Sequence, residues 1–392
     1  MAKYKVGIIG TGRPWRTEGA RGSGLSHVHA NGYRESADCE LVAAADLVQE
    51  NVDSFCHEHH IAHGYTDYKE MLEKEDLDIV SIAVWRPMHT PMIVDAARAG
   101  VKAIHCEKPM AHTWANAKQQ VAVCKEHGVQ LTFNHQNRFV PGHRKAKALL
   151  DAGAIGQPLQ IIATGSDLFE VGTHWMDLMF FMNNDVPAKW VIGQIDAGKV
   201  GRFRMPIPEV GQAVSFFQFE NGVYGQVNAK GGAWDRGMHG DFPGMDAYVR
   251  VIGTEGIIDA GVLNGPECRM LGKETGGVWK DFTFPYSAES YGEKVFQAAE
   301  NLNVNLPGHQ WQTTMPWIAQ IAANIFDLVD ALNTGREPEC SGDKALRSAE
   351  VAFATYESSR RRGVVNLPLD VDDNAFITML EEGVVKQEQA EQ

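Results

Sequence analysis

The chain has few cysteines, and none of them is arranged as a structural cysteine would be. Its 392 residues include six cysteines, and no two of them form a CxxC pair. A disulfide scaffold or a zinc knuckle would need closely spaced pairs. We therefore expect free thiols in a reducing compartment, and we interpret the protein as cytoplasmic.

The sequence also lacks a long apolar run and an excess of positive charge. No stretch approaches the roughly 20 apolar residues that a membrane-spanning helix needs, and no charged leader precedes an apolar segment at the start. The formal net charge of −14 argues against nucleic acid or anionic lipid as a partner. The length of 392 residues favours two domains in an ordinary globular protein.

The first third of the chain alternates short apolar runs with helical patterns. Buried strands that alternate with helices in this way predict a doubly wound parallel sheet. We therefore predict an α/β nucleotide-binding domain over residues 1–133. The apolar runs lie at residues 3–9, 41–46, 79–84, 101–106 and 129–133.

The pattern changes near residue 134, where long runs of strand character begin. Two of these runs, residues 213–219 and 223–228, are separated by Glu220-Asn221-Gly222, which is a strong hairpin signal. We predict an α+β domain over residues 134–392 with a large, mostly antiparallel open sheet.

The loop after the first apolar run carries half of a dinucleotide-binding fingerprint. Gly10 and Gly12 follow the run, but Trp15 stands where a third glycine would fall. Arginines in the enlarged loop, Arg13 among them, could contact phosphate or could simply lie on the surface. The glycines alone are weak evidence, because the full fingerprint also needs a following acid.

That acid is present at the end of the second apolar run. Asp46 could accept hydrogen bonds from both ribose hydroxyls of the adenosine half and would repel a 2′-phosphate. It could instead cap the following helix. We expect NAD rather than NADP as the cofactor. The loop arginines argue against this preference, because they could bind phosphate.

A lysine follows the fourth apolar run, in Glu107-Lys108-Pro109. Together with Gly10 and Gly12, Asp46 and Arg138-Phe139, in this order and spacing, it makes the chain resemble the glucose–fructose oxidoreductase / inositol dehydrogenase / rhizopine catabolism (Gfo/Idh/MocA) family. The resemblance covers the chain to about residue 370. It implies a Rossmann domain that binds NAD(P), a C-terminal substrate domain, chemistry on a sugar or cyclitol hydroxyl, and a homodimer or homotetramer.

The resemblance also implies site residues. The family usually carries a D-x-x-x-H motif, and here Glu170 stands in place of the aspartate while His174 is present. A spacing of four would place both on one helical face, where Glu170 could orient His174, contact the substrate or be structural. His89 matches a family histidine on the nicotinamide side. The expected cofactor-binding residues are Gly10, Gly12, Arg13, Asp46, His89, Glu107, Lys108 and Pro109.

We expect Lys108 and His174 to carry the chemistry. Hydride leaves a carbinol carbon only as the hydroxyl loses its proton, so a base must stand within hydrogen-bond reach. His174 titrates in a suitable range, and Lys108 can stabilise the developing alkoxide. The nicotinamide would accept the hydride.

Further residues are candidates for binding substrate or metal. His135, Asn137 and Arg138 open the second domain and could bind substrate hydroxyls. Trp234 suits a sugar ring, although its glycine-rich loop could equally be a surface hairpin. We expect no metal site, because ligation needs convergent ligands at fixed spacing and the densest histidine cluster falls on a connection that we expect to be exposed. That cluster is His57, His59, His60 and His63.

These residues favour an NAD-dependent dehydrogenase that acts on a secondary hydroxyl of a sugar, glycoside or cyclitol. One alternative is an NAD-dependent glycosidase, in which transient oxidation allows elimination of the aglycone before the hydride returns. The other is a non-catalytic NAD-binding sensor, against which the presence of both Lys108 and His174 speaks.

Overall fold

The structure of the chain is a computed structural model that divides into two compact units. It describes residues 3–12, 24–165, 167–201, 209–230, 247–262, 266–303 and 315–385. Unit 1 comprises Met1–Ala111, Lys118–Phe139 and Pro285–Asp343. Unit 2 comprises His112–Ala117, Val140–Phe284 and Lys344–Gln392.

Unit 1 contains a six-stranded sheet in the order β3-β2-β1-β4-β5-β6, in which every pairing is parallel. This order is that of a doubly wound dinucleotide-binding sheet, as the sequence predicted. The five predicted apolar runs are all strands here, and only the three-residue β3 was not foreseen. The strands are β1 (Tyr4–Ile9), β2 (Cys39–Ala45), β3 (His63–Tyr65), β4 (Ile79–Ile82), β5 (Ala103–Cys106) and β6 (Gln130–Phe133).

Helices connect these strands along the chain. At the start of α3, the Asp67 side chain accepts a hydrogen bond from the Lys69 amide, as is typical of an N-cap residue. The helices are α1 (Leu25–Glu35), α2 (Gln49–His59), α3 (Tyr68–Lys74), α4 (Arg86–Arg98) and α5 (Trp114–Glu126).

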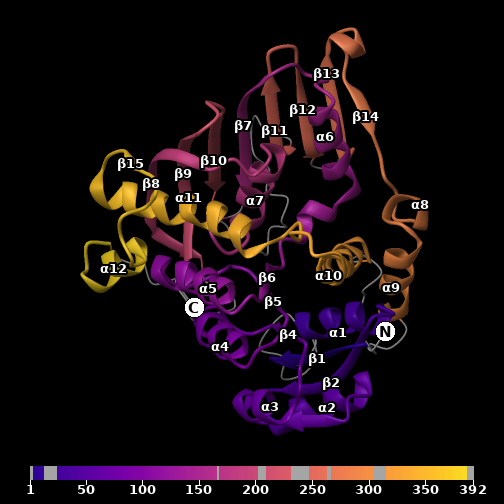
Figure 1. Cartoon of the computed structure of the whole chain (residues 1–392). Helices are drawn as coiled ribbons and strands as arrows, with labels where there is room; N and C mark the ends of the chain where they lie inside the picture. Colours follow the sequence, from indigo (N-terminus) through magenta and orange to yellow (C-terminus); the bar gives the residue numbers. More distant parts are fainter. Residues whose placement is uncertain are drawn as a thin grey trace. The chain divides into compact units, whose positions relative to one another are not determined.

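Unit 1 also takes in a late segment of the chain, which corrects the predicted second domain of residues 134–392. This segment forms α8 (Ala288–Tyr291), α9 (Glu293–Asn303) and α10 (Met315–Thr334), and α9 and α10 lie beside α1 (Figure 1). A Cβ at Gly32 of α1 would lie 2.7 Å from Ile325 of α10. Such a long-range return of the chain leaves no trace in local hydrophobic periodicity.

Unit 2 is built on a nine-stranded sheet in the order β14-β13-β12-β11-β7-β10-β9-β8-β15. Its pairings are antiparallel except that of β7 with β10, so the predicted mostly antiparallel sheet is confirmed. The predicted hairpin joins β9 to β10. The strands are β7 (Pro158–Gly165), β8 (Ala188–Gly201), β9 (Glu209–Phe219), β10 (Tyr224–Lys230), β11 (Ala247–Gly253), β12 (Gly256–Val262), β13 (Cys268–Gly272), β14 (Lys280–Phe282) and β15 (Val365–Asn366).

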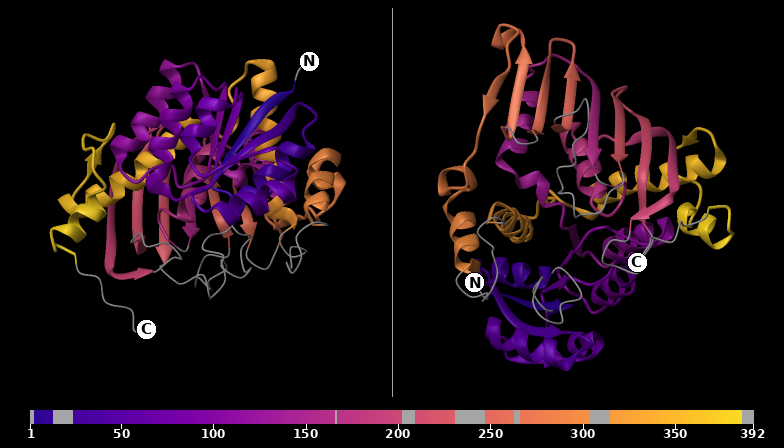
Figure 2. Two further views of the ribbon diagram at one scale, coloured as in Figure 1. Left: turned by 90° about the horizontal axis from the view of Figure 1, so that it is seen from below. Right: turned by 180° about the vertical axis from the view of Figure 1, so that it is seen from behind.

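Helices of unit 2 cover one face of this sheet. Figures 1 and 2 show α6 (Pro141–Asp151), α7 (Gly172–Met182) and α11 (Gly342–Arg361) on the same side of the strands. Phe217 and Phe219 of β9 are fully buried on that side, and the hydroxyl of Ser215 bonds that of Thr355 at 2.8 Å. A further helix of unit 2 is α12 (Ala375–Glu381). Within the residues that the structure describes, no helix combines the length and the apolar character needed to cross a bilayer.

The opposite face of β8 to β10 carries exposed apolar side chains. Val214 of β9 is 49% exposed and Ile192 of β8 is 43% exposed. Beside them, the rings of Phe216 and Tyr224 stack with centroids 5.4 Å apart. The strands around β9 therefore have apolar side chains on both faces, as the sequence predicted.

Candidate functional site

The glycine turn after β1 lies against the acid that ends β2. Gly10 has a φ of 91°, and a Cβ there would lie 2.6 Å from the carbonyl oxygen of Ala83, so no other residue fits. The amide of Gly12 donates a hydrogen bond to Asp46 Oδ2 at 3.1 Å. Asp46 Oδ1 accepts one from the amide of Val48 at 3.0 Å. Asp46 thus both steadies the approach to α2 and stands at the glycine turn.

Two further features of this sheet edge fit a dinucleotide. Leu47 is 90% exposed and Val48 is 49% exposed, so an apolar surface flanks Asp46 and is suited to the flat face of an adenine. The residue before α1 is Gly24, which has no side chain that could cap the first amides of the helix. The N-terminus of a helix favours phosphate, so these amides suit the phosphates of a dinucleotide. Arg13 lies outside the described residues.

A buried carboxylate holds the segment that carries Lys108. Glu107 is 4% exposed, and its Oε1 accepts hydrogen bonds from His29 Nε2 at 2.9 Å and from Asn134 Nδ2 at 2.7 Å. Its Oε2 accepts one from the amide of Lys108 at 3.2 Å. Burial acts to raise the pKa of Glu107, but His29, Lys108 and Asn134 together lower it overall. Glu107 is therefore ionised and fixed, and its carboxylate is engaged by the protein itself.

Lys108 and Pro109 come one residue after the end of β5, at the carboxyl edge of the sheet. The peptide bond between them is cis. Lys108 is half-buried, whereas Pro109 is buried. His89 is fully buried and lies with Nδ1 3.1 Å from the carbonyl oxygen of Pro109 and Nε2 3.0 Å from that of Val84.

Burial lowers the pKa of His89, which favours the neutral ring. A ring enclosed between two backbone carbonyls is suited to bracing the loop that presents Lys108. This places His89 beside the expected cofactor residues, in a bracing position.

His29, Ser81 and Asn134 belong to this arrangement and were not predicted from the sequence. His29 Nδ1 lies 2.9 Å from Ser81 Oγ, which completes a buried polar chain that leads to Glu107. Ser81, a polar residue within the apolar strand β4, was the available signal, since a buried polar group needs a partner. The sequence could not say which partners these residues have.

The residues predicted to bind substrate differ in their exposure. His135 is 1% exposed and Arg138 is fully buried, while Asn137 is partly exposed. All three lie in or next to the short 3₁₀ helix Gln136–Phe139. Trp234 lies outside the described residues.

Unit 2 holds the other predicted catalytic residues. His174 lies in the first turn of α7 and is 7% exposed, and Glu170 is 6% exposed. Because α7 begins at Gly172, Glu170 precedes the helix, and the prediction that the two share one helical face is wrong. The carboxylate of Asp167, not foreseen, accepts hydrogen bonds from the amides of Val171 and Gly172 and so fixes the start of the helix.

The histidine cluster after residue 56 does not lie wholly at the surface as predicted. His59 is 3% exposed, because the last turn of α2 packs on α1 through Phe55, whose ring centroid is 4.4 Å from that of His59 and 4.8 Å from that of His27. Burial, with the neighbouring His27, lowers the pKa of His59 to about 3. The remaining members, His57, His60 and His63, are exposed.

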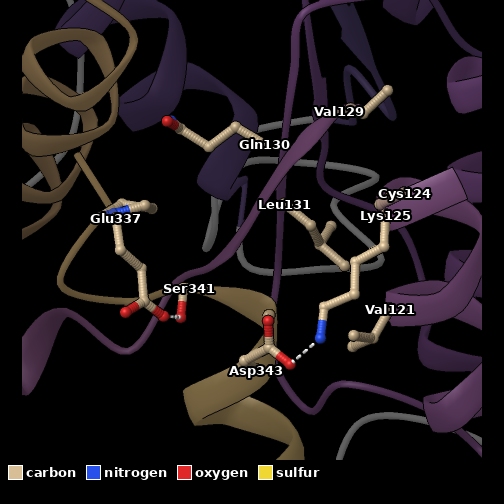
Figure 3. Close-up of a pocket in the computed structure, with 11 residues that line it drawn as sticks. Val121, Cys124, Lys125, Val129, Gln130, Leu131, Glu337, Ser341 and Asp343 are labelled. Atoms are coloured by element: carbon tan, nitrogen blue, oxygen red, sulfur yellow. Dashed lines mark hydrogen bonds and ion pairs between the residues drawn. The ribbon is translucent and has the colours of Figure 1, made fainter. Parts of the chain in front are cut away.

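A surface pocket in unit 1 lies apart from the predicted site residues (Figure 3). It is formed by α5, β6 and the segment that leads to α11. Lys125 and Asp343 form an ion pair of 2.5 Å on its wall, and Ser341 donates a hydrogen bond to Glu337. Neither Lys108 nor Asp46 lines this pocket. Of the side chains that line it, Lys125 pairs with Asp343 and Ser341 bonds to Glu337.

The parallel sheet, the glycine turn and Asp46 define a Rossmann protein that binds a dinucleotide. Residues 4–135 match the model of the GFO_IDH_MocA family, described as "Oxidoreductase family, NAD-binding Rossmann fold". Residues 4–135 therefore have the NAD-binding Rossmann domain of the Gfo/Idh/MocA oxidoreductases.

Relatives extend the likeness over most of the chain. D-apiose dehydrogenase of Paraburkholderia graminis is 27% identical over 98% of this chain and 96% of its own length. The scyllo-inositol 2-dehydrogenase (NAD(+)) of Bacillus subtilis is 28% identical over 69% of this chain and 77% of its own. The crystal structure of an NAD binding oxidoreductase from Klebsiella pneumoniae has the same fold, with a TM-score of 0.72, 19% identity, and coverage of 94% of this chain and 100% of that one.

Proposed function

We propose that the chain is an NAD-dependent dehydrogenase that oxidises or reduces a secondary hydroxyl of a sugar, glycoside or cyclitol. The observation that carries this proposal is the placement of Lys108. It follows β5 at the same carboxyl edge of the parallel sheet at which Gly10 follows β1 and Asp46 follows β2. In doubly wound sheets this edge is where ligands bind.

Lys108 would act on the oxygen of the reacting alcohol. Bound NAD would supply the hydride acceptor. The Lys108 ammonium would donate a hydrogen bond to the substrate oxygen and stabilise the negative charge that develops there. Three residues would assist without touching the substrate: Glu107, His29 and His89. They hold the backbone from which Lys108 projects, so Lys108 would lose less conformational freedom when the substrate binds.

His174 would take the hydroxyl proton. An imidazole has an ordinary pKa near the physiological range and can accept a proton in one direction and return it in the other. Asp167 holds the first turn of α7, which carries His174, through backbone hydrogen bonds. Glu170 would either orient this histidine or bind a substrate hydroxyl.

A panel assay tests the proposed function. Sugars, glycosides and cyclitols are offered with NAD, and the absorbance of NADH and the release of aglycone are followed together. We expect NADH to accumulate with at least one member of the panel. Aglycone release without NADH accumulation would instead establish the glycosidase reaction, and NAD binding without either product would establish the sensor.

Asp46 should make the protein prefer NAD to NADP. A carboxylate that faces a phosphate in place of a hydroxyl costs at least ~1 kcal/mol. Titration of both cofactors should therefore give tighter binding of NAD, and Asp46→Asn should narrow the difference. Asp53→Asn is the matched control, because Asp53 is an exposed acid of α2. Equal or tighter binding of NADP by the unmodified protein would refute the preference.

We also propose that the chain forms a homodimer or homotetramer through the exposed face of β8 to β10. Wide apolar patches are rare on soluble monomers, and closed symmetry favours even-numbered assemblies. Light scattering should give a mass of two or four times 43.2 kDa. Val214→Asp should lower this mass, whereas Val384→Asp, at a 68% exposed valine elsewhere in unit 2, should not. A mass near 43.2 kDa for the unmodified protein would contradict the assembly.

A further inference from the structure

Two helices of unit 1 bring two histidines and a glutamate to one point. His27 comes from α1, and Glu58 and His59 are the last two residues of α2. His27 Nδ1 lies 3.0 Å from His59 Nε2 and 3.3 Å from Glu58 Oε2. Glu58 Oε1 lies 3.7 Å from His59 Nε2. One ligand atom from each residue thus falls within 4.8 Å of the other two.

The contact made by one ring nitrogen of His27, Nε2, indicates what the other ring nitrogen, Nδ1, can bind. His27 Nε2 lies 3.1 Å from the carbonyl oxygen of Gly12. A carbonyl oxygen can only accept, so Nε2 carries a proton and Nδ1 is the ring nitrogen that can bind a cation. Nδ1 faces the carboxylate of Glu58 at 3.3 Å and His59 Nε2 at 3.0 Å. A cation between the three groups would take the place of a proton on Nδ1.

The ligand atoms lie close enough for one such cation. Zinc binds imidazole nitrogen and carboxylate oxygen at roughly 2.0–2.2 Å in a tetrahedron, which places neighbouring ligand atoms about 3.3 Å apart. The two ring nitrogens lie 3.0 Å apart, and each lies near a different oxygen of Glu58, Oε2 at 3.3 Å from His27 and Oε1 at 3.7 Å from His59. Metal-bound histidines also typically donate their other ring N–H to a backbone carbonyl or a carboxylate, and His27 is bonded in this way.

We propose that His27, Glu58 and His59 form a binding site for a zinc-class divalent cation. The two rings are held by Phe55, and their side chains are 2% and 1% exposed. The Glu58 side chain is 22% exposed, which gives the cation a path of entry and leaves a fourth position for water. Imidazole ligands favour zinc and its neighbours over magnesium, which prefers oxygen.

The site is linked to the glycine turn. The carbonyl of Gly12 accepts from His27, and its amide donates to Asp46. A cation that fixes the His27 ring would thereby fix the peptide group of Gly12 from one side while Asp46 holds it from the other. The cation therefore stabilises the NAD-binding unit and takes no part in proton transfer.

Calorimetric titration of the chelator-treated full chain with Zn²⁺ and with Mg²⁺ tests the site. We expect one tight Zn²⁺ per chain and no tight Mg²⁺. Glu58→Gln and His59→Gln should each weaken the Zn²⁺ affinity by at least about tenfold. His57→Gln is the matched control, an exposed histidine of the same helix, and should leave the affinity unchanged. Absence of tight Zn²⁺ binding, or equal affinity in Glu58→Gln and the unmodified chain, would overturn the proposal.

Thermal unfolding separates loss of the ligand from loss of the fold. Glu58 is partly exposed, so Glu58→Gln should fold even if the buried His59→Gln does not. A ligand that binds only the folded state raises Tm, so Zn²⁺ should raise the Tm of the unmodified chain and of His57→Gln, and raise that of Glu58→Gln much less. An equal rise in all three would place the bound zinc elsewhere in the chain and contradict the site.

Discussion

Lys108→Ala is expected to lower turnover by ~10²-fold or more while leaving NAD affinity largely unchanged. The ammonium is proposed to meet negative charge that exists only as the hydroxyl proton leaves, so its removal weakens the transition state more than the bound ground state. Steady-state kinetics on a substrate found in the panel assay, with NAD affinity from a separate titration, measure the two effects independently.

Lys102→Ala is the matched control for this loss. Lys102 precedes β5 by one residue, is exposed, and pairs with Asp78 at 2.7 Å. Its replacement removes the same charge from the same segment at the opposite end of the strand, and turnover should stay near that of the unmodified protein. Full turnover by Lys108→Ala would eliminate the role assigned to this lysine.

His174→Ala is expected to lower turnover by a similar ~10²-fold or more, again with NAD affinity largely intact. Without a base, the hydroxyl proton would have to pass to water. Glu170→Gln should have a milder effect, because an amide of the same shape can still hold a neighbour or a substrate hydroxyl. The same kinetic measurements compare the two variants.

His127→Ala serves as the control here, since His127 is exposed and follows α5. Its turnover should match that of the unmodified protein. A larger loss in Glu170→Gln than in His174→Ala would identify the glutamate as the base. Unchanged turnover in His174→Ala would remove the histidine from the reaction.

The fold could be predicted from the sequence where the signal was local. Short apolar runs gave the strands of the parallel sheet, since strands covered on both faces are apolar throughout. The hairpin between β9 and β10 followed from Asn221-Gly222. The inclusion of α10 in unit 1 could not be predicted, because it depends on the fit of Ile325 against Gly32, residues far apart in the chain.

The candidate site could likewise be predicted only where the signal was local in the sequence. Gly10, Asp46 and Lys108 could be found because each follows a strand and carries a recognisable residue type. The role of Glu107 could not, because it depends on His29 and Asn134, which approach it only in the folded chain. The pairing of His27 with His59 was missed for the same reason, since burial of the end of α2 depends on packing between helices.

Transfer of deuterium is the most direct test of the central claim, that this chain moves a hydride between a carbinol carbon and NAD. A substrate from the panel, labelled with deuterium at the carbon that bears the reacting hydroxyl, is converted with NAD, and the reduced dinucleotide is analysed by mass spectrometry. We predict one deuterium in each molecule of NADH formed. Unlabelled NADH, or conversion of the substrate without any accumulation of NADH, would contradict the account.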